Sequence, residues 1–225
     1  MNNRNRIPFI LVLLLLFACQ IPSGMKLQPA TLTPSPTATI TVTPTLTLTP
    51  TLTITPTPAP LARRVLILSI DGLRPDAISL APMPTLTALI SSAAYSLSAQ
   101  TIYPSSTLPS HTSMLSGLCP KKHGVNWNDY LPENGYAQVT DIFDIAHAAG
   151  MQTVMYVGKE KLQQITEPSS VDIFEYINDR DLVITEKLIE NFPADFDLMF
   201  IHFPTADAMG HVYGWLSGEQ LSVLY

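Results

Sequence analysis

Short, continuous runs of apolar residues follow one another along the chain after residue 64, and such runs are typical of strands buried on both faces of a sheet. They lie at residues 65–70, 152–157 and 197–203. Stretches with helical spacing of apolar residues lie between them, at residues 84–94, 141–149 and 181–191. The alternation of strands and helices predicts an α/β fold with a largely parallel central sheet flanked by helices.

The ends of two predicted helices carry specific signals. Pro84 suits the first turn of the helix at 84–94, because an N–H in the first turn has no acceptor within the helix and proline lacks this N–H. In the helix at 141–149, we expect Thr140 to cap the first turn and Gly150 to end the helix. The residues expected to face the core are Ile142, Phe143, Ile145 and Ala146.

The first residues of the chain have the pattern of a bacterial lipoprotein signal. Arg4 and Arg6 precede an apolar run at residues 7–18, which is too short to span a bilayer comfortably and ends at Cys19. The Leu-Phe-Ala-Cys sequence there resembles a lipobox, so we expect residues 1–18 to be a signal peptide and Cys19 to be lipidated. This predicts an exported protein, lipid-anchored at the outer face of a bacterial membrane. The alternative is an uncleaved signal anchor, or a plain signal with an incidental cysteine.

Residues 19–62 are predicted to form a stalk. Between Pro29 and Pro60, threonine alternates with proline or a small aliphatic residue, and the recurrent prolines prevent the hydrogen-bond ladder that a strand needs. An extended chain of this kind reaches at most about 100 Å, at about 3.1 Å per residue. The stalk would hold the folded part, residues 63–225, away from a membrane. Neutral low-complexity sequence is the alternative.

The charge of the folded part limits the ligands that it can bind. From Val65 onward the chain carries all 18 acidic residues but only 7 of the 12 basic ones, a local net charge of −11. Such a surface repels a polyphosphate backbone, which excludes binding of duplex nucleic acid through phosphate contacts. A small anionic substrate would need the help of bound cations.

Polar residues that could carry chemistry follow the first and last predicted strands, where parallel sheets bind their ligands. Asp71 comes directly after the first strand, a position that suits a metal ligand or, equally, a turn or helix cap. Asp207 and His211 follow the last strand and would converge on one metal if their segment is helical, with Gly210 removing bulk beside them. Residues 103–128 are dense in hydroxyls and imidazoles, and a hydroxyl at a helix N-terminus lies where the dipole favours an oxyanion and a phosphate.

The chain carries three sequence blocks in order: SIDGLRPDAI, STLPSHTSMLSGLCPKKHGVNWN and FPTADAMGHVYG. Together they resemble the type I phosphodiesterase and nucleotide pyrophosphatase family of the alkaline phosphatase superfamily, from Val65 to the C-terminus. The resemblance implies an alkaline-phosphatase-like fold. The family also has an Asp-His-Gly block and a late His that this sequence lacks, so we expect the chain to be the N-terminal part of the domain, incomplete at its C-terminus.

The resemblance implies a role for each matching residue. Thr107 matches the nucleophile, and Asn128 matches the residue that donates a hydrogen bond to a phosphoryl oxygen. The implied metal ligands are Asp71, Thr107, Asp207 and His211. The implied cofactors are two divalent metal ions, with zinc as the expected metal. His111 and His123 resemble structural histidines of the family.

The function implied by the resemblance is metal-dependent hydrolysis of nucleotide-type phosphodiester bonds. The substrate would be a small phosphate ester, cleaved through a phosphothreonine intermediate. The same metal core serves phosphomonoesterases and phosphonate hydrolases, which are the first alternative. A non-catalytic surface lipoprotein that keeps half of the site is the second.

Because the sequence lacks some of the implied ligands, we expect residues 61–225 alone to bind zinc weakly and to be inactive. The measurement is hydrolysis of a chromogenic phosphodiester in the presence of added zinc. Zinc-dependent hydrolysis above that of a metal-free control would contradict this expectation.

Overall fold

The computed structural model describes residues 62–224. The predicted signal peptide, the predicted lipidation of Cys19 and all but the last residue of the predicted stalk lie outside this range. Within the range, no helix combines the length and the apolar character that crossing a bilayer requires.

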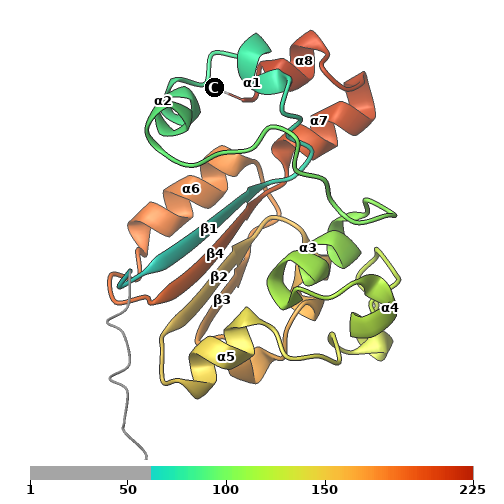
Figure 1. Cartoon of the computed structure of the whole chain (residues 1–225), viewed down its shortest axis with the longest axis vertical. Helices are drawn as coiled ribbons and strands as arrows, with labels where there is room; N and C mark the ends of the chain where they lie inside the picture. Colours follow the sequence, from blue (N-terminus) through green and yellow to red (C-terminus); the bar gives the residue numbers. More distant parts are fainter. Residues whose placement is uncertain (1–61, 225) are drawn as a thin grey trace, which may run out of the picture. The chain divides into compact units, whose positions relative to one another are not determined.

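Four parallel strands form the centre of the described region (Figure 1). In spatial order they are β1 (Val65–Ile70), β4 (Leu198–Phe203), β2 (Thr153–Val157) and β3 (Ile173–Tyr176). Ile70 lies opposite Phe203, and Val157 lies opposite His202, so β1, β4 and β2 end almost level with one another. The predicted α/β fold with a parallel sheet is confirmed.

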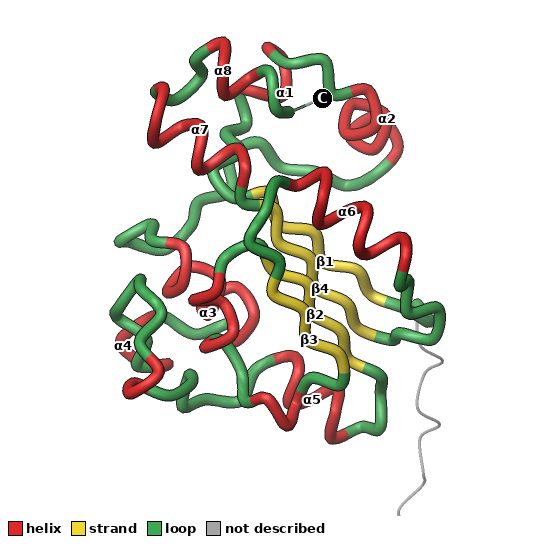
Figure 2. The backbone as a smooth tube through the Cα atoms, turned by 180° about the vertical axis from the view of Figure 1, so that it is seen from behind, coloured by secondary structure: helices red, strands yellow, loops and turns green. Residues whose placement is uncertain are grey.

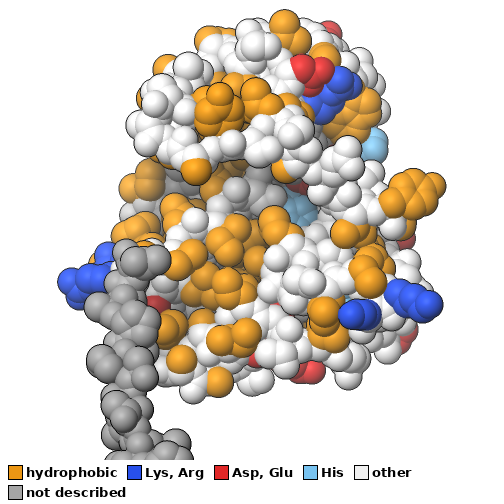
Figure 3. All heavy atoms as spheres, in the orientation of Figure 1, with side chains coloured by type: hydrophobic (Ala, Val, Ile, Leu, Met, Phe, Trp, Pro, Cys, Tyr) orange, Lys and Arg blue, Asp and Glu red, His pale blue; other side chains and the backbone are white. Residues whose placement is uncertain are grey.

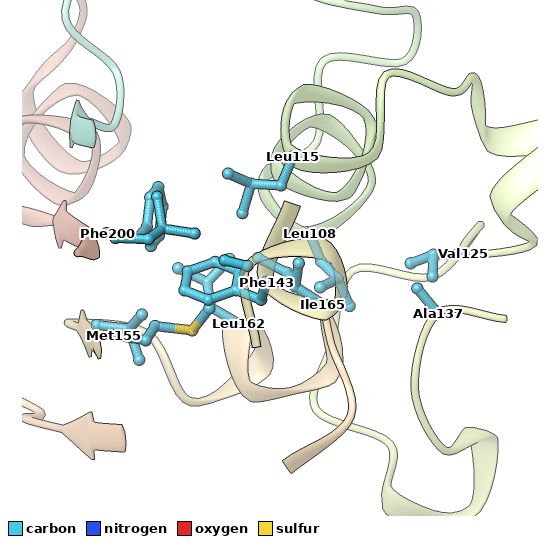
Figure 4. Close-up of a cluster of buried hydrophobic side chains, with 12 residues drawn as sticks. Leu108, Leu115, Val125, Ala137, Phe143, Met155, Leu162, Ile165 and Phe200 are labelled. Carbon is cyan, nitrogen blue, oxygen red and sulfur yellow. The ribbon is translucent and has the colours of Figure 1, made fainter. Parts of the chain in front are cut away.

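Helices cover both faces of the sheet, because alternate side chains of each strand point to opposite faces. On one face, α6 (Asp181–Glu190) packs on β2 and β4. That cluster consists of Val154, Tyr156, Ile177, Ile184, Leu188, Phe196, Met199 and Ile201. On the other face, α3 (Thr107–Ser116) and α5 (Ile142–Ala148) contribute to a larger cluster around Phe143, which Figure 4 shows.

β1 differs from the expectation that its apolar run is buried on both faces. Val65, Leu66 and Leu68 are 45%, 55% and 50% exposed, whereas every residue of β2 is buried. β1 lies at the edge of the described sheet, next to β4 alone. Figure 3 shows apolar side chains at the surface on this side of the molecule. An apolar run does not distinguish a central strand from an edge strand, which is why the prediction was wrong.

Two helix details also differ from the prediction. α5 begins one residue later than expected, and Asp141 rather than Thr140 caps it, in a capping box closed by Asp144. One oxygen of Asp141 accepts two N–H groups of the first turn, which a threonine at position 140 is one residue too early to do. Ile145 is 64% exposed, because the short helix buries only the stripe that contains Phe143.

The remaining helices are short, and several gather beyond the C-terminal ends of the strands (Figure 2). They are α1 (Ala77–Leu80), α2 (Pro84–Ser92), α7 (Thr205–Tyr213) and α8 (Gly218–Leu221) there, with α4 (Pro120–His123) beside α3. Ala77, Ala206 and Leu221 join α1, α7 and α8 in a small apolar cluster with Ile70 of β1. α2 matches its predicted position but contains no buried residue. α1, α2, α7 and α8 therefore lie together beyond the C-terminal ends of the strands.

Candidate active site

Four segments that are distant in sequence meet at the C-terminal ends of the strands. Asp71 follows β1, Lys159 follows β2, Asp207 lies in the first turn of α7 after β4, and Thr107 begins α3. The backbone N–H of Asp71 donates to the carbonyl of Phe203 at 3.0 Å, which extends the β1–β4 ladder into the site. The structure therefore brings Asp71, Thr107 and Asp207 together, as the sequence predicts.

Asp71 Oδ2 accepts three hydrogen bonds from three different elements. The donors are Thr107 Oγ1 at 3.1 Å, Lys159 Nζ at 2.7 Å and His202 Nε2 at 3.3 Å. Burial raises the pKa of Asp71, but the hydrogen bond from His202 and the charge of Lys159 together lower it by more, to well below the usual aspartate value. Asp71 is therefore a firmly ionised carboxylate.

Lys159 was missed by the sequence analysis, although it contacts three of the predicted site residues. Its Nζ donates to Asp71 Oδ2, to Asp207 Oδ2 at 2.5 Å and to Thr107 Oγ1 at 3.3 Å. Burial lowers the pKa of Lys159, but the charge of Asp71 and the hydrogen bond to Asp207 raise it by more. The side chain therefore stays an ammonium ion. Its position next to the end of a predicted strand, two residues after Val157, was the signal that could have identified it.

Asp207 and His211 lie on one face of α7, so the helical segment that their convergence requires is present. His211 Nε2 lies 3.5 Å from Asp207 Oδ1, and the His211 side chain is 70% exposed. Gly210 was expected to leave space beside Asp207 and His211, but the space that it leaves is filled by Trp215. A Cβ at Gly210 would lie 2.4 Å from the ring of Trp215, which packs edge-on against His211 at 5.3 Å between ring centroids.

Thr107 is the first residue of α3, where the helix dipole favours negative charge. The N–H of the next residue, Leu108, donates to Asn128 Oδ1 at 3.0 Å. This bond holds the Asn128 amide beside the helix N-terminus and leaves its Nδ2 hydrogens to donate elsewhere. Thr107 and Asn128 are therefore close in space, as required if Thr107 attacks a phosphoryl group to which Asn128 donates a hydrogen bond.

Two buried histidines, His111 and His202, contact site residues, and a third, His123, packs beside α3. His111 bonds Ser69 Oγ through Nε2 at 2.8 Å and the carbonyl of Thr107 through Nδ1 at 2.7 Å. Burial, then the neighbouring His202, lower the pKa of His111. His123 bonds Ser113 within the packing of α3. His202 was missed by the sequence analysis, although a histidine inside the apolar run of β4 was the available signal.

The oxygen atoms of the site fit a divalent cation. In residues 62–224, no three His, Cys, Asp or Glu side chains form a metal cage. However, the carboxylates of Asp71 and Asp207 already share one cation, the Lys159 ammonium, and Thr107 Oγ1 is its third partner. Such carboxylate and hydroxyl oxygens are ligands for hard or borderline metals.

The site opens into a cavity of about 900 Å³. Asp71, Thr107, Asp207, His211 and Trp215 all contribute to its lining. Ligand sites of this size hold small molecules.

Gly72 allows β1 and α7 to approach each other at this site. It has φ +74°, and a Cβ on it would lie 2.6 Å from Cα of Asp207. Any larger residue would therefore push Asp207 away from Asp71. Glycine is required here both for its backbone conformation and for the space that it leaves.

A comparison with family models identifies the family of this chain. The model of the type I phosphodiesterase / nucleotide pyrophosphatase family matches residues 65–224. The chain belongs to this family. The match covers all four strands and every site residue described above. No curated protein sequence matches the chain.

Solved structures share the fold of this family member. Murine ectonucleotide pyrophosphatase / phosphodiesterase 5 has 22% identity and a TM-score of 0.58, with 72% of this chain and 48% of that chain covered. Phosphonoacetate hydrolase from Sinorhizobium meliloti, in complex with phosphonoacetate, has 18% identity and a TM-score of 0.52, with 71% and 50% covered. The chain thus spans about half the length of the solved structures that it matches.

Replacing Gly72 by alanine should destabilise the protein more than the same change at Gly150. Both glycines have φ +74°, but a Cβ at Gly150 meets no atom within 4 Å. Gly150→Ala should therefore cost only the strain of the backbone, about 1–2 kcal/mol, whereas Gly72→Ala adds about 1–3 kcal/mol of overpacking. Urea unfolding of both variants measures the difference. Equal losses of stability would show that the approach of β1 to Asp207 is not as tight as described.

Proposed function

We propose that this chain carries the nucleophile of a metal-dependent hydrolase that cleaves nucleotide-type phosphodiester bonds through a phosphothreonine intermediate. The observation that carries the proposal is the position of Thr107. Thr107 is the first residue of α3, and its hydroxyl donates to Asp71 and lies 3.3 Å from the Lys159 ammonium. Asn128 accepts a hydrogen bond from the N–H of the next residue, Leu108. Membership of the family supports this assignment.

The Thr107 hydroxyl would lose its proton to solvent, and Oγ would attack phosphorus and form a new P–O bond while the P–O bond to the alcohol or phosphate leaving group breaks. The leaving group would take up a proton from water. Attack of water on the phosphothreonine would then release the phosphate product and restore the hydroxyl.

The hydroxyl proton of Thr107 points to Asp71 Oδ2. An aspartate carboxylate is a far weaker base than an alkoxide, so Asp71 would not deprotonate the Thr107 hydroxyl unaided. The Thr107 hydroxyl therefore needs a neighbouring Lewis acid, which supports metal dependence.

Asp71 and Thr107 would hold one divalent ion, and Asp207 and His211 would contribute to holding a second. When bound, such ions lower the pKa of a coordinated hydroxyl or water and balance the charge of the phosphoryl group. Zinc is the metal that we propose. Cations at this position would also let a domain with a net charge of −11 after residue 64 accept an anionic substrate.

A nucleotide is the proposed substrate class. An inactive threonine-to-alanine variant of the murine relative was solved in complex with AMP. That protein's binding of AMP supports a nucleotide or related ester as the substrate here. The cavity of about 900 Å³ has room for a ligand of that size. Asn128 Nδ2 and the N-terminus of α3 would bind the phosphoryl oxygens.

A phosphomonoester or a phosphonate is the second candidate substrate. Either one carries one more negative charge than a diester. Phosphonoacetate hydrolase, which was solved in complex with phosphonoacetate, shares the fold, and this supports a phosphonate as the second candidate. The ratio of kcat/KM for a chromogenic diester to that for the matching monoester decides between the two candidates, because only a ratio above one supports the diester.

We also propose that the protein is exported and lipid-anchored through Cys19, on the evidence of the N-terminal sequence pattern. The mature protein should fractionate with membranes, and Cys19→Ser should release it. Mass spectrometry of the N-terminal peptide should show a lipid on Cys19. An unmodified Cys19 in the mature protein would rule out this anchor.

Replacing Thr107 by alanine tests the nucleophile in the protein expressed from its own gene. Turnover of a chromogenic phosphodiester should fall by at least about a thousandfold, because no other hydroxyl takes the same position. The zinc content should stay largely unchanged, since Asp71 and the other ligands remain. Thr107→Ser, which keeps a hydroxyl, is the matched control and should retain measurable turnover.

The same experiment separates the enzyme from a non-catalytic surface lipoprotein. The enzyme gives zinc-dependent turnover that Thr107→Ala removes. Full activity of Thr107→Ala would show that Thr107 is not the nucleophile. If the unmodified protein is inactive both with and without added zinc, a binding protein is favoured.

A further inference from the structure

Lys159 contacts ligand atoms that belong to both proposed metal positions. Its ammonium has three N–H donors, and its bonds to Asp71 Oδ2, Asp207 Oδ2 and Thr107 Oγ1 can use all three. Asp71 and Thr107 were assigned to one ion and Asp207 to the other. The ammonium is therefore the cation that links the two halves of the site in this structure.

The Lys159 ammonium and a metal ion compete for the same space. Nζ lies 2.7 Å from Asp71 Oδ2 and 2.5 Å from Asp207 Oδ2. A zinc ion bonded to a carboxylate oxygen lies at about 2.0–2.2 Å from it, in the same direction as the oxygen lone pairs. A metal ion that binds either Oδ2 atom on the side that Lys159 now uses must therefore displace Nζ from that oxygen.

The charged side chains of this cluster are largely shielded from solvent, so an unpaired charge among them would destabilise the fold. The side chains of Lys159, Asp71 and Asp207 are only 20%, 14% and 15% exposed. Removing one partner of a buried ion pair leaves an uncompensated charge, which is strongly destabilising. Without the ammonium, two neighbouring carboxylates would repel each other.

The backbone of the protein holds Lys159 in this position. Lys159 follows Gly158 directly after β2, and a Cβ at Gly158 would lie 2.4 Å from the ring of Pro204 at the end of β4. The ends of β2 and β4 are therefore in close contact. This brings the base of the Lys159 side chain to the first turn of α7, where Asp207 lies.

We propose that Lys159 is an internal counterion that balances Asp71 and Asp207 in the metal-free protein, and that it must leave both carboxylates when a metal binds. The inference rests on the proposed function, because it takes both aspartates as metal ligands. It predicts opposite effects for one substitution. Loss of Lys159 weakens the metal-free fold and strengthens metal binding.

The test compares zinc binding and metal-free stability in the purified protein expressed from its own gene, its Lys159→Gln variant and a matched Lys161→Gln control. Lys161 has the same charge two residues further along and feels the charges of Asp71 and Asp207, but it makes no ion pair with either aspartate. By titration calorimetry, Lys159→Gln should bind zinc at least about tenfold more tightly, since zinc no longer displaces charge-assisted hydrogen bonds. Its metal-free unfolding temperature should fall, and zinc should raise it by more than in the unsubstituted protein. Lys161→Gln should show neither change to a comparable extent.

A third variant, Lys159→Arg, keeps the test decisive if Lys159→Gln folds poorly. Arginine retains the charge, so its zinc affinity should stay near that of the unsubstituted protein. A requirement of Lys159→Gln for zinc in order to fold would support the proposal.

Three results separate the failure of this inference from the failure of the proposed function. Zinc binding that Lys159→Gln leaves unchanged or weakens would overturn the counterion role alone. Unchanged zinc affinity with weaker binding of inorganic phosphate would also overturn it, because Lys159 would then act on the substrate. If none of the proteins binds zinc, the proposed metal dependence fails, and the competition fails with it.

Discussion

The site is organised around one carboxylate oxygen, Oδ2 of Asp71, which accepts hydrogen bonds from Thr107, Lys159 and His202. A carboxylate sheltered from water is stable only when its charge is compensated by donors, and here each donor comes from a different part of the fold. Thr107 comes from α3, Lys159 from the loop after β2, and His202 from β4. The compensation of one charge therefore fixes the relative positions of three segments at the end of β1.

The parallel sheet makes this convergence possible, because it delivers the ends of β1, β4 and β2 to one place. The alternation of side chains along the strands then gives each face its own cluster, with α6 on one face and α3 and α5 on the other. Close approach of the polar segments depends on Gly72, which leaves the space that Asp207 occupies. Apolar packing positions the helices on the sheet, and the ionic hydrogen bonds bring the polar side chains together at the C-terminal ends of the strands.

The sequence predicts the parts of this molecule that depend on local pattern. The apolar runs locate β1, β2 and β4, and the strand-end rule selects Asp71 and Asp207. The same rule could have selected Lys159, but a lysine does not belong to the motif that drew attention to the carboxylates. β3 was not predicted, because it has only four residues and contains the charged Glu175. The exposure of β1 depends on which strands are its neighbours, and a linear pattern does not contain that information.

We propose that the Lys159 ammonium and bound metal ions occupy the carboxylates of Asp71 and Asp207 in turn. The most direct measurement is anomalous diffraction at the zinc absorption edge from crystals of the protein grown with zinc. We expect a zinc peak at about 2.0–2.2 Å from carboxylate oxygens of Asp71 or Asp207, with Lys159 Nζ withdrawn from both. Bound zinc elsewhere in the protein, with the Lys159 bonds to both aspartates intact, would contradict it.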